Sequence, residues 1–366
     1  MNEVARIKSI LDFKYQRFAS ESMFSTAKQK NAFEWFQTRL KELEKEARDN
    51  GDQLERHDLW RRQYYKYPYL FFEDDYTVIN RFSDIFFNIF EINRESKISP
   101  RTSLSSRILF FQLFTEIIEE TNWRLILNSE NAPSATFRIK EYFKDGIPLG
   151  CRMFGNREHI PGNWLVKYSK SEFVRDMLRN GRFKISPATE YAKGNYNRAI
   201  SDLETTRHFR LKAIKERLDG ETAIEFQGNS MPISNGVIPL DIEIGDYYLF
   251  STCSEIDRRL PTDFEATSAL IIKDRKRFVS LLRAAVLTKF ANWSFTAGDV
   301  FYFDPYNDAP VIPELEMWKN FSFSYQKEHR CLLRRKSVTD AVGQLEPFFV
   351  ELGPLMDFCE VVEGEF

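Results

Sequence analysis

The sequence predicts an α+β protein in which a mainly helical region precedes a domain built on a split, mostly antiparallel β-sheet. Between residues 27 and 124, long stretches carry apolar residues at helical spacing. Between residues 164 and 351, short strand-like runs alternate with helices. Asn, Pro and Gly accumulate around residues 128–163, which indicates loops. We therefore predict a helical N-terminal domain over 1–135 and a second domain over 136–366.

The first predicted helix covers residues 27–50. Phe36, Leu40 and Leu43 form part of one apolar stripe, and Gly51 is a suitable stop. Residues 76–93 and 103–124 are rich in Phe, Ile and Leu, which predicts two buried helices.

The second domain opens with a predicted strand at Trp164–Tyr168. Ser169 and Glu172 fit a capping box at the start of a helix that ends at Gly181. Further strands are expected at 182–186, 246–252, 268–272, 299–304, 321–334 and 347–351, with a basic helix at 196–218 and another helix at 274–286.

Bulk composition indicates a globular protein. The 366 residues are 43% hydrophobic and 29% charged, with a formal net charge of −2. That charge does not favour a general electrostatic grip on nucleic acid. The four cysteines form no CxxC pair and the four histidines have no ligand spacing, so we expect buried thiols and no metal site.

The N-terminus, MNEVARIKSILDFKYQ, mixes charged and apolar residues and lacks the apolar core of a signal peptide. No window has the roughly 18 unbroken apolar residues that a membrane span requires. We therefore expect a cytoplasmic protein that does not engage membranes.

The common phosphate-binding and hydrolase motifs are absent. The sequence has no GxxxxGK[ST], no GxGxxG after a strand, no GxSxG and no set of kinase motifs. Nucleotide hydrolases of the P-loop type, Rossmann enzymes, α/β-hydrolases and kinases are thereby disfavoured.

Three short elements at predicted strand positions remain as candidates for chemistry. They are Lys167-Tyr168, Ser251-Thr252-Cys253 and Gln326-Lys327-Glu328. If residues 321–334 form one strand, Gln326 and Glu328 point to the same face, roughly 6–7 Å apart. Arg330 shares that face, where we expect it to pair with Glu328, and His329 faces the other side.

In their order and spacing these elements resemble the ADP-ribosyltransferase superfamily. Its members carry an NAD contact on a first strand, a Ser-Thr-Ser-like element on a middle strand and Gln-x-Glu or Glu-x-Glu late in the domain. LVKYSKSEFVRDMLRNGRFKISP and FSFSYQKEHRCLLR also look like a diffuse bacterial family related to these transferases. The resemblance covers residues 160–350. Lys167-Tyr168 stands where one branch has arginine, and Ser-Thr-Cys replaces Ser-Thr-Ser.

The resemblance implies an ADP-ribosyltransferase-like split sheet and NAD as co-substrate, without a metal. Glu328 would stabilise the oxocarbenium-like state of the ribose, and Gln326 would orient the nucleophile. Tyr168 and Lys167 would contact the nicotinamide or its ribose. Ser251 and Thr252 would hold the ribose or brace Glu328. Arg182 would pair with the pyrophosphate.

Aromatic residues suggest where an acceptor could bind. In these transferases the segment before Gln-x-Glu contacts the acceptor, which implicates Trp318, Phe321 and Tyr325. The run Trp60–Phe72 interleaves rings with basic residues, as single-stranded RNA or DNA binding requires. Ordinary core packing is the alternative for all of these rings.

The leading functional hypothesis is a mono-ADP-ribosyltransferase that modifies a nucleic-acid base or a protein side chain. The resemblance further suggests an intracellular toxin or phage-defence effector, with RNA, DNA or protein as acceptor and an antitoxin or chaperone as partner. The alternatives are a non-catalytic interaction protein and a hydrolase, either an NAD glycohydrolase or a nuclease, that uses Glu328 with a carboxylate such as Asp304. Replacing Glu328 is expected to abolish activity and leave the fold intact.

Overall fold

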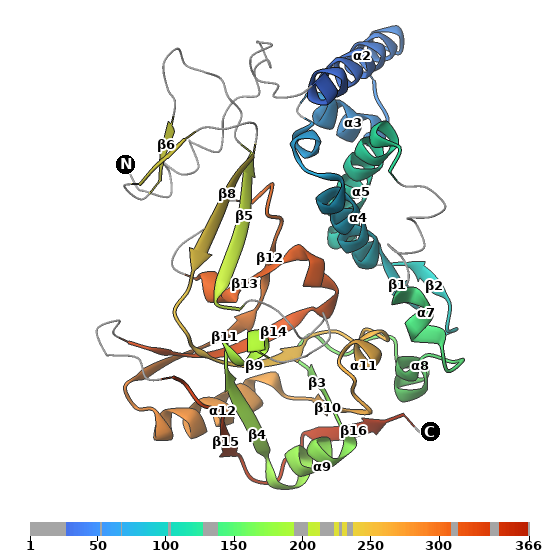
Figure 1. Ribbon diagram of the computed structural model, residues 1–366. Coiled ribbons are helices and arrows are strands. Elements are labelled where there is room, and N and C mark those ends of the chain that lie inside the picture. The colour runs from blue at the N-terminus through green and yellow to red at the C-terminus, as the bar shows by residue number, and fades with distance from the viewer. Residues whose placement is uncertain are drawn as a thin grey trace.

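The computed structural model describes residues 27–51, 53–66, 68–101, 104–126, 138–193, 204–212, 223–226, 229–232, 237–308, 314–336 and 344–364. Residues 1–26 and the predicted domain boundary lie outside these ranges. The helical region consists of α2 (Ala27–Asp49), α3 (Arg56–Lys66), η2 (Tyr69–Phe72), α4 (Asp75–Ile89) and α5 (Leu104–Arg124). It occupies the upper right of Figure 1.

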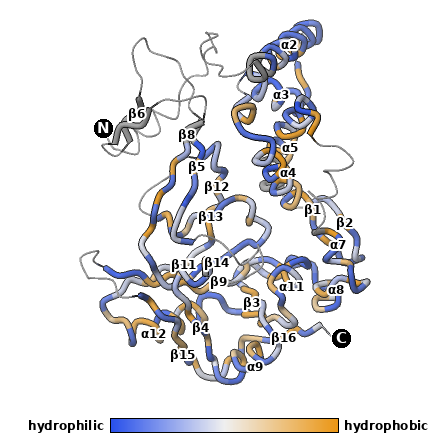
Figure 2. The backbone as a smooth tube through the Cα atoms, in the orientation of Figure 1, coloured by the Kyte–Doolittle hydropathy of each residue, from blue (hydrophilic) through white to orange (hydrophobic). Residues whose placement is uncertain are grey.

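The three long helices predicted in this region are confirmed, with one change at the end of α4. The chain leaves α4 at Ile89 and forms the hairpin β1 (Phe90–Ile92) and β2 (Ile98–Pro100). Apolar residues of α2, α4 and α5 pack into one cluster with the rings of α3 and η2. In Figure 2, α4 and α5 carry long hydrophobic stretches, whereas α2 is mostly hydrophilic.

The second region is built on an eight-stranded sheet. Its main path runs β11-β14-β9-β3-β10-β16, and all its strand pairs are antiparallel. The strands are β3 (Leu165–Ser169), β4 (Arg182–Pro187), β9 (Tyr248–Cys253), β10 (Ser268–Ile272), β11 (Trp293–Asp299), β14 (Glu328–Arg335), β15 (Phe348–Glu351) and β16 (Cys359–Glu363). The α+β class is therefore confirmed.

Strand β9 has two different neighbours on one edge. Near its end, Cys253 pairs with Val166 of β3. Near its start, Leu249 pairs with Ser186 of β4, which continues to β15. Helix α9 (Ser171–Asn180) connects β3 to β4 and packs against both. Helix α12 (Arg275–Lys289) packs against β11 and β15.

The predicted capping box before α9 is wrong. Ser169 ends β3, where it pairs with Ser268 of β10, so it is not available as the cap. Lys170 is the N-cap and makes no side-chain capping bond. The amide of Ser171 instead donates to Oγ1 of Thr267 at 3.0 Å.

Gly181 ends α9 as predicted, in the left-handed conformation with φ +63°. A Cβ there would lie 2.2 Å from the carbonyl oxygen of Gly353. Gly146 also has positive φ, +85°, but no atom lies within 4 Å of its Cβ position.

We expect Gly181→Ala to lower the free energy of unfolding by about 1–3 kcal/mol more than Gly146→Ala, because only Gly181→Ala adds a backbone clash. Urea unfolding of both variants checks this, and equal losses would contradict it.

The predicted basic helix at 196–218 is wrong where the structure describes it. Thr206–Lys212 form strand β5, which pairs with β8 (Val237–Glu243). The reason is alternation: Arg207 and Phe209 are buried, whereas His208 is exposed and Arg210 is half-buried against Glu73. This hairpin rises above the sheet in Figure 1. Short strands β6 (Ala223–Phe226) and β7 (Asn229–Pro232) lie between β5 and β8 along the chain.

The predicted strand at 321–334 is correct only in its second half. Phe321–Gln326 form the 3₁₀-helix η4, in which the Asn320 side chain accepts from the amide of Ser322 at 2.9 Å. Lys327 then takes a left-handed conformation with φ +46°, and β14 begins at Glu328. Asn88 of α4 holds η4 by accepting from the Tyr325 amide at 2.9 Å. Gln326 and Glu328 are therefore not two positions of one strand face.

Shorter elements connect these parts. Two helices lie in the predicted loop region, and the predicted strand at 299–304 is the end of β11 followed by β12, which pairs in parallel with β13. These elements are α7 (Arg138–Phe143), α8 (Leu149–Phe154), α10 (Glu190–Lys193), α11 (Leu260–Asp263), β12 (Phe301–Phe303), η3 (Leu315–Met317) and β13 (Trp318–Asn320).

The helical region and the sheet region share a polar and an apolar contact surface. Arg81 of α4 forms a buried pair with Asp304, and Arg101 pairs with Asp257. Phe321 and Tyr306 belong to the hydrophobic cluster of the helical region. One hydrophobic cluster therefore includes residues from both sides of the predicted boundary near residue 135.

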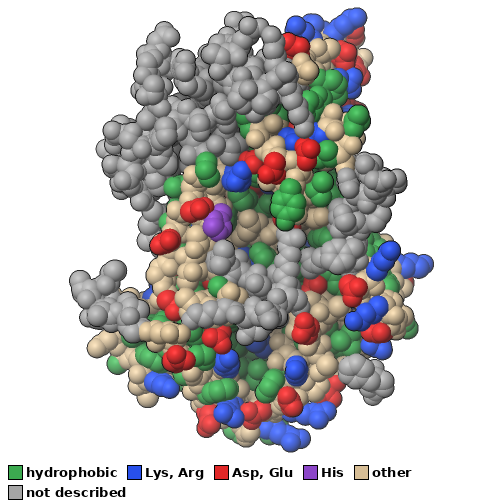
Figure 3. Space-filling model, viewed as in Figure 1, with side chains coloured by type: hydrophobic (Ala, Val, Ile, Leu, Met, Phe, Trp, Pro, Cys, Tyr) green, Lys and Arg blue, Asp and Glu red, His purple; other side chains and the backbone are tan. Residues whose placement is uncertain are grey.

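Three further observations concern the described residues as a group. None of their helices is long and apolar enough to cross a membrane. All four cysteines are buried and free, as predicted. On the face shown in Figure 3, acidic and basic side chains are interspersed over the described surface.

Candidate active site at Glu328

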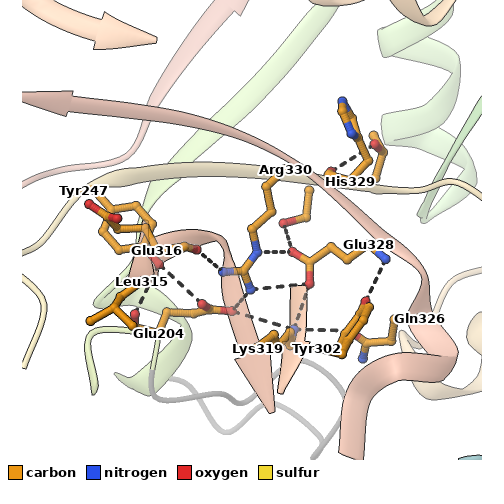
Figure 4. A network of polar contacts seen from close by, with 12 residues as sticks. Glu204, Tyr247, Tyr302, Leu315, Glu316, Lys319, Gln326, Glu328, His329 and Arg330 are labelled. Carbon is orange, nitrogen blue, oxygen red and sulfur yellow. Dashed lines mark hydrogen bonds and ion pairs between the residues drawn. The ribbon is translucent and has the colours of Figure 1, made fainter. Parts of the chain in front are cut away.

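Glu328, the first residue of β14, lies at the centre of a buried polar network (Figure 4). Ser251 of β9 donates its hydroxyl to Oε1 of Glu328 at 2.5 Å. Nε of Arg330 donates to the same oxygen at 2.8 Å, and Lys319 Nζ lies 3.0 Å from Oε2. Only 5% of Glu328 is exposed, so its carboxylate is held by protein groups rather than by water.

A second carboxylate completes the network. Glu204, just before β5, accepts from Arg330 Nη2 at 2.5 Å and lies 3.7 Å from Lys319 Nζ. Arg207 and Tyr247 contact its other oxygen. Gln326 accepts from Lys319 at 3.2 Å, so Lys319 joins it to Glu328 even though Gln326 lies on η4. The backbone amide of Glu328 donates to the Tyr302 hydroxyl at 2.8 Å.

These contacts set the charge of both carboxylates. Burial favours the neutral acid, but the charges of Arg330 and Lys319 outweigh it and hold the pKa of Glu328 well below its usual range. Burial is likewise outweighed at Glu204, where Arg330, Lys319 and Arg207 lower the pKa. Both groups are therefore ionised at neutral pH.

The lowered pKa values predict acid sensitivity. A carboxylate with a lower pKa in the folded state stabilises the fold above its unfolded pKa and loses that contribution as pH falls. We expect stability to decline below about pH 4.5, the ordinary value for Glu328 and Glu204. Urea midpoints between pH 7 and pH 3 check this. Since each unit of pKa shift corresponds to about 1.4 kcal/mol, unchanged stability at pH 3 would contradict the described network.

Tyr168 lies on the same face of the sheet as the Glu328 network. Val166 pairs with Cys253, and Tyr168 packs with both in one cluster. Its ring contacts Phe154 and Phe264, and burial raises its pKa well above the usual value. The structure thus brings Tyr168, Ser251 and Glu328 onto three neighbouring strands, with Tyr168 packed as a core residue.

The remaining residues predicted to contact NAD lie elsewhere. Lys167 is on the opposite face, where its Nζ donates to the Ser251 carbonyl at 2.8 Å, and burial lowers its pKa. Thr252 donates its hydroxyl to the carbonyl of His329 at 3.2 Å, not to Glu328. Arg182 is at the far end of β4, stacked on Phe349 and 3.8 Å from Asp176. Only Ser251 in this group touches Glu328.

The rings predicted to contact an acceptor are buried in three separate clusters. Trp318 packs with Phe303 and Phe209. Phe321 packs with the helical region, and Tyr325 packs in the cluster that contains Val166 and Tyr168 of β3. None of them is exposed for stacking, because each fills a core. The packing alternative therefore describes all three.

The run Trp60–Phe72 also contributes to the core. Tyr64, Tyr65 and Tyr69 are buried and donate their hydroxyls to Glu120, Glu119 and Glu116 of α5. These rings cannot stack on bases in this arrangement. The core-packing alternative therefore describes these three tyrosines, because they face α5.

His329 lies on the other side of β14, as predicted. It is buried, and its Nδ1 lies 3.0 Å from Asp299 and 2.9 Å from Arg275. Asp304 does not accompany Glu328, since both of its carboxylate oxygens accept from Arg81 at 2.9 and 2.8 Å. The carboxylate that joins Glu328 in its network is Glu204 rather than Asp304.

Sequence reasoning missed Glu204, Lys319 and Tyr302. Each reaches Glu328 or Arg330 from a segment outside the central sheet, so no motif spacing marks it. The one available signal was Lys319, a charge in the apolar stretch EMWKNF before η4.

Among the described residues, no group of three or more His, Cys, Asp or Glu is arranged to hold a metal ion. No protein-family model matches the chain, and comparisons with curated proteins and with solved structures give no significant match.

Proposed function

We propose that the region from residue 136 to 366 is an NAD-dependent mono-ADP-ribosyltransferase in which Glu328 is the catalytic carboxylate. The observation that carries this proposal is the 2.5 Å hydrogen bond from Ser251 to Glu328. It joins two motif elements that are 77 residues apart in sequence, on adjacent strands β9 and β14. The split of the sheet at β9 supports the proposal, because the family resemblance implies a split antiparallel sheet.

The chemistry uses the ionised state of Glu328. The bond between the ribose C1′ and the nicotinamide nitrogen breaks, nicotinamide leaves, and positive charge develops on the ribose. The Glu328 carboxylate stabilises that charge, with Ser251 and Arg330 fixing its orientation. The acceptor then attacks C1′ and loses its proton, and Gln326 orients this nucleophile.

In this proposal the described arrangement is the closed state of the site. Lys319 contacts the Glu328 carboxylate, Glu204 lies 3.7 Å from Lys319, and neither residue belongs to the central sheet. NAD binding therefore requires Lys319 to leave Glu328, so that the ribose replaces its ammonium group.

The non-catalytic alternative has its own supporting observation. Both oxygens of Glu328 already have protein partners, and the residue is 5% exposed. Under this alternative the network only joins β14 to β13 and the segment before β5. The wild-type protein would then turn over no NAD.

The test is incubation with NAD labelled on its adenylate and with cell extract, followed by separate analysis of RNA, DNA, protein and free ADP-ribose. Transfer by wild type, lost in Glu328→Gln and retained in the exposed control Glu351→Gln, supports the transferase. Ser251→Ala is the second active-site variant, chosen because it removes one hydrogen bond without leaving a charge unpaired. Free ADP-ribose alone would indicate a glycohydrolase. If the wild-type protein turned over no NAD, both the transferase and the glycohydrolase hypotheses would be refuted.

A further inference from the structure

A cleft of about 910 Å³ lies between the β1–β2 hairpin and the segment that follows β9. Its volume is in the range of small-molecule sites, roughly 300–1,000 Å³. Glu91 lies on the hairpin side, Ser254 and Arg258 lie on the sheet side, and Arg101 and Asp257 join the two. Ser254 directly follows Cys253, the residue paired with Glu328, but Glu328 does not line this cleft.

Arg258 is a buried cation with incomplete hydrogen bonding. Its Nη2 donates to the carbonyl oxygens of Gly155 and Arg157 at 3.2 and 2.8 Å. Its Nε is buried without a partner, and no carboxylate among the described residues forms an ion pair with it. A buried guanidinium held only by carbonyls retains its full charge and favours a nearby anion.

The neighbouring charges do not supply that anion. Asp257 is shared between Arg101 and Arg259, at 2.6 and 2.9 Å. Arg101 also lines the cleft, and its Nε is buried without a hydrogen-bond partner. One carboxylate thus serves two guanidinium groups, so Asp257 is not available as an ion-pair partner for the neighbouring Arg258.

Glu91 provides an acceptor on the opposite wall. It is half-buried on β1, makes no hydrogen bond with the described residues, and has its pKa raised by burial. The other charged pairs around the cleft are satisfied, with Arg94 3.1 Å from Glu158 and Arg275 2.8 Å from Asp299. Glu255 and His159 are exposed at the rim. The cleft lining therefore combines Arg258, which has no ion pair among the described residues, with Glu91 on the hairpin, which has no hydrogen bond among them.

We propose that this cleft binds a nucleotide, with its phosphate toward Arg258 and Arg101 and its ribose hydroxyls toward Glu91. Guanidinium groups recognise phosphate through charge-assisted hydrogen bonds. A carboxylate commonly accepts the hydroxyls of a nucleotide ribose. The inference goes beyond the proposed transfer reaction, because binding is expected whether or not NAD is turned over.

Calorimetric titration of the full chain with ADP, 2′-deoxy-ADP, adenosine and inorganic pyrophosphate tests this inference. Wild type should bind ADP at least about tenfold more tightly than the other three ligands. Arg258→Gln should weaken ADP binding by about tenfold or more, whereas Arg283→Gln, which changes an exposed arginine of α12, should leave it unchanged. Glu91→Gln should abolish the preference for ADP over 2′-deoxy-ADP.

Ser99→Trp is a second variant that should prevent ADP from binding in the cleft, and it is used if Arg258→Gln fails to fold. Ser99 lines the cleft from β2 and is outside the ion pairs, so a large ring there should block ADP and leave the circular dichroism spectrum unchanged. The proposal is overturned if wild type binds no ADP at millimolar concentration. It is also overturned if pyrophosphate binds as tightly as ADP, or if Ser99→Trp retains full affinity.

Discussion

Glu328→Gln is expected to lower the free energy of unfolding by about 3–5 kcal/mol, because it removes one carboxylate from a buried ion network. Arg330 is fully buried and would keep only Glu204 as a charged partner. Lys319 would lose its 3.0 Å contact with the carboxylate and lie 3.7 Å from Glu204. Glutamine has nearly the same shape as glutamate, so the loss of stability in this variant measures the effect of the charge rather than of packing. Urea unfolding at pH 7 measures it.

The matched control is Glu351→Gln, an exposed carboxylate on β15, which should change stability by less than about 0.5 kcal/mol. Combining Glu328→Gln with Lys319→Met should cost less than the sum of the two single changes, since each removes the other's partner. Additive losses would show that the two side chains do not interact. This prediction differs from the sequence-based expectation that replacing Glu328 leaves the fold intact, and the urea measurement decides between them.

Asp304→Asn is expected to destabilise the junction between the helical and sheet regions by about 3–5 kcal/mol. Arg81 donates two hydrogen bonds to Asp304, at 2.9 and 2.8 Å, and both side chains are almost completely buried. Arg81 also lies over the rings of Tyr306 and Phe321, where it cannot be hydrated when its partner is neutral. Burial would raise the pKa of Asp304, but Arg81 outweighs it and lowers the pKa.

Hydrogen exchange is the informative measurement for this variant, because it localises the loss. Protection should fall in α4 and η4 together, since Arg81 of α4 bonds to Asp304 and Asn88 of α4 bonds to Ser324 and Tyr325 of η4. Asp241→Asn, on an exposed residue of β8, is the control and should leave exchange unchanged. If α4 retained its protection in Asp304→Asn, the pair would not be what joins the two regions.

Local sequence patterns located most of the regular elements. The apolar stripes of α2, α4, α5 and α12 and the short strands β3, β4, β9, β10 and β15 were predicted to within a few residues. They could be predicted because each buries one periodic face, which is a property of neighbouring residues. Gly181 was identified as a helix end for an equally local reason, its left-handed conformation.

The errors fall where distant residues decide the conformation. FSFSYQ alternates like a strand, but Asn88 of α4 binds the Ser324 hydroxyl and the Tyr325 amide and holds the segment as a 3₁₀-helix. Ser169 does not cap α9 because its backbone pairs with Ser268 of β10 as the last residue of β3. The rings of Tyr64, Tyr65 and Tyr69 looked available for bases until their hydroxyl partners on α5 were known.

The same division applies to the candidate site. The sequence by itself determined the α+β class, the order of the motif elements, and that Glu328 is the carboxylate to test. Only the tertiary structure decided that Ser251 contacts Glu328, that Arg330, Lys319 and Glu204 surround it, and that Thr252 and Arg182 lie away from it. The physical reason is that a buried charge is stabilised by whichever groups the fold brings within hydrogen-bond distance. In this protein those groups come from segments as far as 126 residues apart.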